Sequence, residues 1–227
     1  EVAVDAILET LPAAAAPQRP FLIRLCDQVC ERPGTPDSAL EKFAKAMAEL
    51  LKTARRPIRI AVLDSRCLGS RVSAETRREI ALQVATSAHD FNLEEVVPLS
   101  EAFLRRLGAP SVKELAKAIK SSPHQVEREI ALRSLDAILG DDTGLAKEAG
   151  DALRLCLDLL KDGKFPNEPL LAITTGRIAA LSGAPSAAVR GTTMELRNLL
   201  RARPGRFEVL EAYSWCVSSR HVEAEQK

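Results

Sequence analysis

The chain has 227 residues and a mass of 24.6 kDa, of which 46% are hydrophobic and 28% are charged. These are the proportions of an ordinary soluble protein, and no apolar run approaches the roughly 20 residues that a membrane span needs. The net charge of +1 excludes a strong overall attraction to nucleic acid or to an anionic membrane.

The types of apolar residue predict a helical protein. Aromatic residues make up only 4% of the chain, and the remaining apolar residues are mainly Ala, Leu, Val and Ile. This composition favours helix-on-helix packing over a core built around large aromatic rings.

The cysteines and the first residue bear on where the protein resides. Five cysteines, an odd number spread over apolar positions, indicate a reducing compartment and not a disulfide framework. Because the chain begins with Glu1 and not Met, we expect a fragment, a processed form or part of a longer protein. Removal of an organellar transit peptide, and hence a mitochondrial or other organellar matrix, is one hypothesis.

The first elements in chain order are two short helices, at residues 2–11 and 21–31. The segment 12–20 between them has four alanines between prolines, so it is predicted to be a linker. Residues 1–31 therefore form a predicted N-terminal region. A long amphipathic helix follows, opened by Thr35 as the N-cap and Pro36 at the first helical position.

Residues 57–64 are the one segment with the alternation of a β-strand, through Ile58, Ile60 and Val62. A single strand would have nothing to pair with, because no second convincing strand occurs. We interpret the segment as the short return helix of a hairpin, with a strand as the alternative.

Helical patterns with polar starts fill the rest of the chain. Ser73 opens a helix, and Gly108 ends the one after it. Two capping boxes, Ser111 to Glu114 and Ser122 to Gln125, open two further helices, the second ending at Gly140. The remaining predicted helices begin at Thr143, Asn167, Ser186 and Arg206, and the last is followed by a polar tail at 221–227.

The helix starts recur at a nearly fixed spacing. Thr35, Ser73 and Ser111 are 38 residues apart, Thr143 follows after 32 residues and Ser186 after 43. A helical period of about 38–40 residues predicts an all-α, right-handed stack of helical hairpins, an α-solenoid, over residues 35–220. The uneven later spacing leaves an irregular helical bundle as the alternative. In its period and its Ala- and Leu-rich texture the segment resembles HEAT and armadillo arrays and octotricopeptide repeats.

Three groups of residues have types that could do chemistry, and each has a structural interpretation that we prefer. Cys26 and Cys30 are four apart on a helix but lack further zinc ligands, so we expect two buried thiols. The acidic pair at 141–142 suits a helix N-terminus better than a metal site. Ser65, Cys67 and Ser70 have only His89 as a nearby base, and we predict no catalytic residue, metal, cofactor or small-molecule substrate.

The arginines are the more informative pattern. One group lies on a single helix and its following turn, where Arg197 and Arg201 share a face with Arg190 two turns earlier. Successive hairpins of a solenoid present equivalent positions on one surface, so arginines of different hairpins could form one track. The alternative is that they are simply solvated or complement helix dipoles. The candidate contact residues for a partner or nucleic acid are Arg190, Arg197, Arg201, Arg203, Arg206, Arg55, Arg56 and Arg59, with Arg77, Arg78, Arg105 and Arg106 as further members of the track.

Two functions follow from this sequence. The first is a non-enzymatic scaffold or accessory subunit that binds other protein subunits in a larger assembly, because surface recognition is the remaining use of such a fold. The alternative is an RNA-binding helical-repeat protein that uses the arginines to follow a phosphate backbone, with Tyr213 and Trp215 as the candidates for base stacking.

Overall fold

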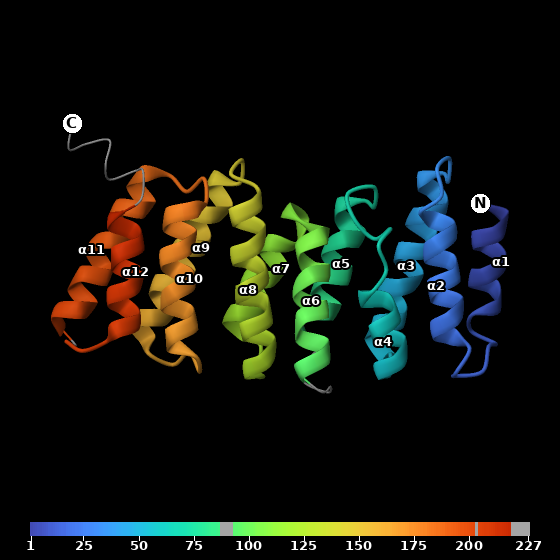
Figure 1. Cartoon of the computed structure of the whole chain (residues 1–227), viewed down its shortest axis with the longest axis horizontal. Coiled ribbons are helices and arrows are strands. Elements are labelled where there is room, and N and C mark those ends of the chain that lie inside the picture. The colour runs from blue at the N-terminus through green and yellow to red at the C-terminus, as the bar shows by residue number, and fades with distance from the viewer. Residues whose placement is uncertain (87–92, 203, 219–227) are drawn as a thin grey trace. The chain divides into compact units, whose positions relative to one another are not determined.

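The computed structural model describes residues 1–86, 93–202 and 204–218. Twelve α-helices and one short 3₁₀-helix lie within these residues, and no strand does, so the predicted all-α class is confirmed (Figure 1). None of the described helices is long and apolar enough to cross a membrane. The helices are α1 (Val2–Thr10), α2 (Arg19–Cys30), α3 (Asp37–Thr53), α4 (Arg56–Leu63), α5 (Ala74–Ala85), α6 (Leu93–Leu107), η2 (Ala109–Ser111), α7 (Val112–Ser121), α8 (Gln125–Asp141), α9 (Ala146–Asp162), α10 (Glu168–Leu181), α11 (Ser186–Ala202) and α12 (Phe207–Val217).

The chain forms two compact units, residues 1–118 and 119–227. In the first unit α1, α3 and α5 pack in one row and α2, α4 and α6 in another. In the second unit α9 and α11 form one row, and α8, α10 and α12 the other. Within each unit a helix contacts its chain neighbour and the helix after that, which is the packing of stacked hairpins. The repeat type, the handedness and the predicted boundaries at 31–35 and 220 remain predictions, and the tail 221–227 lies outside the described residues.

The predicted period is present in the helix starts. Helices α3, α5, α7, α9 and α11 begin 37, 38, 34 and 40 residues apart. Of the segment 12–20, predicted to be a linker, residues 12–18 form turns between α1 and α2, and the last two residues already belong to α2.

Two of the predicted N-caps are confirmed. The Ser73 hydroxyl accepts a hydrogen bond from the Thr76 amide at 3.2 Å at the start of α5. The Asn167 side chain accepts one from the Leu170 amide at 3.2 Å at the start of α10.

The caps predicted for α3 and α7 are wrong. Thr35 donates its hydroxyl backward to the Val29 carbonyl at 2.8 Å, and α3 begins after Pro36. Ser111 belongs to the 3₁₀ turn η2, which follows Gly108 with a φ of 68°, and its buried hydroxyl has no partner among the described residues. A residue already in a helical turn cannot direct its side chain onto the first free amides as an N-cap does.

The caps predicted for α8 and α9 are also wrong. Ser122 instead donates to the Glu127 carboxylate and accepts from the His124 amide, so α8 begins at Gln125 and runs past Gly140 to Asp141. The Asp142 side chain accepts a hydrogen bond from the Gly144 amide at 3.0 Å and so forms a turn that contains Thr143. Helix α9 therefore begins only at Ala146.

The segment 57–64 is helical, as preferred from the sequence, and the strand alternative is wrong. Residues 56–63 form α4, with Pro57 in its first turn. This short helix packs against α2, α3 and α6, so nearly all of its sides are covered. That environment explains why its apolar residues do not follow a single helical stripe.

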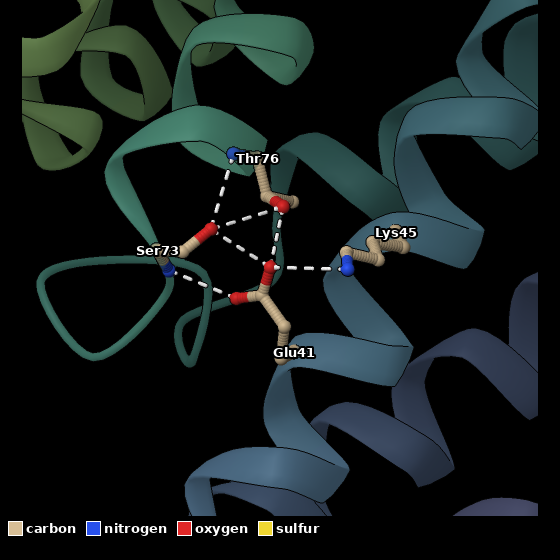
Figure 2. Close-up of polar contacts among 4 residues, drawn as sticks. All are labelled: Glu41, Lys45, Ser73 and Thr76. Atoms are coloured by element: carbon tan, nitrogen blue, oxygen red, sulfur yellow. Dashed lines mark hydrogen bonds and ion pairs between the residues drawn. The ribbon is translucent and has the colours of Figure 1, made fainter.

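A polar cluster fastens α3 to the start of α5. The Glu41 carboxylate accepts hydrogen bonds from the Ser73 amide at 2.9 Å and hydroxyl at 2.8 Å, and from the Thr76 hydroxyl at 2.5 Å (Figure 2). Lys45 lies 3.9 Å away on the next turn of α3. The cluster therefore joins a helix to the N-terminus of the equivalent helix in the next hairpin.

Candidate binding surface

The basic residues of α4 divide into exposed and interior members. Arg55 and Arg56 are exposed at the start of the helix. Arg59 is only 3% exposed, and its guanidinium donates to the Leu51 carbonyl at 3.0 Å. The structure therefore places Arg59 in the core, where it joins α4 to the end of α3 and does not reach a surface partner.

Two further arginines of the predicted track are also used inside the first unit. Arg106 donates to the carbonyls of Leu63 and Ser65, each at 2.9 Å, and stacks 5.4 Å from the Phe103 ring. Arg77 donates to the Leu107 carbonyl at 2.9 Å. These guanidinium groups satisfy main-chain oxygens at helix ends, so both arginines have a structural role within the unit.

A cleft of about 650 Å³ lies beside Arg55 in the first unit. Its walls come from the α1–α2 segment and from the junction of α3 and α4, and most of its lining is apolar, including Pro17, Leu50 and Ile58. Arg19 closes one side by donating to the Pro12 and Ala14 carbonyls.

The α11 arginines are placed as the sequence predicts. Arg190, Arg197 and Arg201 are all exposed on one side of the helix, and Met194, 67% exposed, lies among them. Arg197 and Arg201 make no hydrogen bond or ion pair with the described residues. Glu195 is the one acidic residue in the sequence of α11 that could neutralise these arginines, but it forms an ion pair with Lys161 of α9 at 3.0 Å.

Arg206 differs from the other arginines of this group. Its side chain is 12% exposed and forms ion pairs with Glu168 at the start of α10 and Glu208 at 3.5 Å. It therefore holds the start of α12 against α10. Arg203 lies outside the described residues.

The exposed arginines of α11 point away from the preceding hairpin. Ala188 is the α11 residue that approaches Gly150 of α9, and Glu195 reaches Lys161 on the same side. At about 100° per residue, Arg197 lies on the opposite side of the helix from Ala188. The arginines thus occupy the side on which a further hairpin would stack.

The apolar stripe of α12 points the same way. Ala212 and Trp215 meet Gly176 of α10, where an added Cβ would lie 2.7 Å from the Ala212 Cα. Leu210 and Val217 are on the other side of α12, and they are 51% and 39% exposed, with the half-buried Tyr213 between them. We call the α11–α12 face the set of Arg190, Met194, Arg197, Arg201, Leu210, Tyr213 and Val217.

The sequence predicts the stripe of α12 but not its exposure. The spacing of Leu210, Tyr213 and Val217 is that of a helix packed on one side, and sequence reasoning takes such a stripe as core. The spacing and residue types of the stripe do not by themselves distinguish an exposed stripe from a buried one.

Three of the five cysteines, Cys26, Cys30 and Cys67, form a cluster in the first unit. The Cys30 thiol hydrogen-bonds with those of Cys26 and Cys67, which lowers the pKa of Cys30, while the same bonds and burial raise the pKa of the other two thiols. Asp27 beside them accepts from the Arg66 and Cys67 amides, each at 3.1 Å, and so fixes the loop after α4. No group of side chains suited to hold a metal ion occurs among the described residues, and His89 lies outside them.

No protein-family model and no curated protein matches this sequence. Among solved structures, a crystal structure of an engineered protein, a target of the Northeast Structural Genomics Consortium, is similar to it with a TM-score of 0.50 and 16% identity. The match covers 97% of this chain and 96% of that chain. At this identity the likeness concerns the helical fold alone.

Proposed function

We propose that this protein is a non-enzymatic helical scaffold that binds other protein subunits through the α11–α12 face. The observation that carries this proposal is the uncovered packing stripe of α12, in which Leu210 and Val217 are exposed, as is Met194 of α11. Apolar side chains gathered on one side of a terminal hairpin are typical of a surface that a partner covers.

The use of charged residues elsewhere supports a structural role for the rest of the chain. Arg59, Arg206 and Asp27 each join one element to another through hydrogen bonds or ion pairs. We further propose a reducing compartment, because all five cysteines are free thiols. A mitochondrial or other organellar matrix stays a prediction.

RNA binding is the second candidate function, and one observation favours it. The three exposed arginines of α11 could contact phosphates, and Phe207 at the start of α12 is 79% exposed and could stack on a base. In the first unit three arginines of the predicted track, Arg59, Arg77 and Arg106, bond to main-chain oxygens, whereas Arg55 and Arg56 are exposed. A protein partner therefore accounts for more of the observations.

Sedimentation of the native protein from its source lysate, with and without ribonuclease, tests this function. We expect a large particle that survives the nuclease and loses the protein when Leu210→Glu and Val217→Glu are combined. A matched variant, Arg154→Glu on the exposed side of α9, should remain in the particle. Collapse of the particle on nuclease treatment would favour RNA binding, and migration as a small species under both conditions would contradict both functions.

A further inference from the structure

We propose that the partner segment is an acidic amphipathic α-helix, which packs on the α11–α12 face as the first helix of a further hairpin would. This inference rests on the proposed function and adds the chemistry of the partner. It commits to a helix with an apolar stripe on one side and carboxylates along the neighbouring side.

The apolar half of the face fits the side of a helix. Leu210, Tyr213 and Val217 follow the spacing i, i+3 and i+7, and therefore form a row of about 10 Å along two turns of α12. The other side of α12 meets α10 through Ala212 and Trp215, so Leu210, Tyr213 and Val217 lie on the side turned away from α10. A partner with apolar residues at the same helical spacing would cover this row.

The positively charged half of the face favours a partner with acidic side chains. Arg190, Arg197 and Arg201 extend over three turns of α11, about 16 Å, parallel to the apolar row across the α11–α12 hairpin. Arg197 and Arg201 have no counter-ion among the described residues, since Glu195 is held by Lys161. Two uncompensated positive charges beside an apolar row would repel a basic helix and attract an acidic one.

The two halves together set the size of the partner segment. Neighbouring packed helices lie 8–10 Å apart, so one helix seated between α11 and α12 touches both rows. To span Arg190 to Arg201 it needs about three to four turns, or roughly 12–15 residues. Its carboxylates must lie to one side of its apolar stripe, toward α11.

The probes for the test are two synthetic fluorescein-labelled peptides of 18 residues with the same leucine stripe. One carries glutamates and the other lysines beside the stripe, and binding to the full chain is followed by fluorescence anisotropy at 50 and 200 mM NaCl. We expect the glutamate peptide to bind at least about tenfold more tightly than the lysine peptide, with the difference shrinking at higher salt.

Variants of the chain locate the peptide. Combining Arg197→Glu and Arg201→Glu should weaken the glutamate peptide about tenfold or more and reverse the preference between the peptides, whereas Arg154→Glu should change neither. Combining Leu210→Ser and Val217→Ser should weaken both peptides alike. Circular dichroism of each variant verifies that the helices remain folded.

Three results would overturn the inference. They are equal binding of the two peptides, indifference of the preference to the α11 substitutions, or binding of a single-stranded RNA 20-mer that depends on Arg197 and Arg201 while neither peptide binds. If the native particle persists and still needs Leu210 and Val217, such results reject the acidic helix alone and leave the proposed function standing.

Discussion

Glu41 illustrates how single polar side chains hold neighbouring hairpins together. Burial raises the pKa of its carboxyl, but hydrogen bonds from Thr76 and Ser73 outweigh this effect, so the pKa is lowered in the folded protein. A lowered pKa means that the cluster stabilises the fold when the pH is above the carboxyl's unfolded value, and that this stability is lost as the pH falls through the folded value.

We therefore predict that Glu41→Gln lowers the free energy of unfolding at pH 7 by about 1 to 2 kcal/mol, because two hydroxyls and an amide lose a charged acceptor. The difference from wild type should shrink as the pH falls below 4.5, the ordinary value for this carboxyl. Urea unfolding at several pH values measures it, with Glu49→Gln on the exposed side of α3 as the control. A difference that is the same at pH 7 and pH 3 would contradict the role of the charge.

Single arginines are where sequence reasoning is weakest. Arg59 and Arg206 are candidates from the sequence just as the exposed Arg55 and Arg201 are, yet they are largely buried and bonded to Leu51 and Glu168. Their partners are distant in the chain or on another helix. No local pattern encodes which guanidinium faces a carbonyl and which faces water, so the predicted exposure holds for Arg55, Arg56 and the α11 arginines but not for Arg59 and Arg206.

A close contact between helices joins α10 and α12 at Gly176. A Cβ added there would lie 2.7 Å from the Ala212 Cα and 2.9 Å from its carbonyl oxygen, both of them backbone atoms that cannot rotate away. The absence of a side chain at this position thus sets how near α12 approaches α10.

Gly176→Ala should consequently destabilise the protein by about 1 to 3 kcal/mol, although alanine is the better helix former. Gly191→Ala on α11 is the matched control, because a Cβ there meets nothing within 4 Å, and it should stabilise by up to about 1 kcal/mol. Thermal unfolding of both variants followed by circular dichroism decides between packing and propensity. Stabilisation by both substitutions would contradict this prediction, because it would mean that α12 moves away from α10 at little cost in free energy.

The elements themselves are largely encoded by local signals. Apolar periodicity predicts the helices, and their starts keep the expected spacing even where Thr35, Ser111, Ser122 and Thr143 do not act as caps. The period depends on the length of a hairpin that can pack on its neighbour, whereas a cap depends on the turn before each helix. Prolines, glycines and the turn at Asp142 determine the turns before the helices, so cap positions shift by one to three residues while the repeat persists.

At the scale of the molecule, each unit stacks hairpins, and α11 and α12 form the last described hairpin of the second unit. Within the described residues no helix covers Leu210 and Val217, and no acid meets Arg197 and Arg201. The proposed function and the proposed partner both follow from this uncovered side of the hairpin. From the sequence alone, the apolar stripe of α12 is expected in the core, and the arginines of α11 could simply be solvated.

Hydrogen–deuterium exchange, read helix by helix on the isolated chain and on the chain in its native assembly, tests the central claim most directly. We predict that amides of α12 and of the second half of α11 exchange more slowly in the assembly, because a partner that covers the α11–α12 face suppresses fraying of the terminal hairpin. Unchanged exchange in α11 and α12, with new protection confined to other helices, would contradict the claim that this face holds the partner.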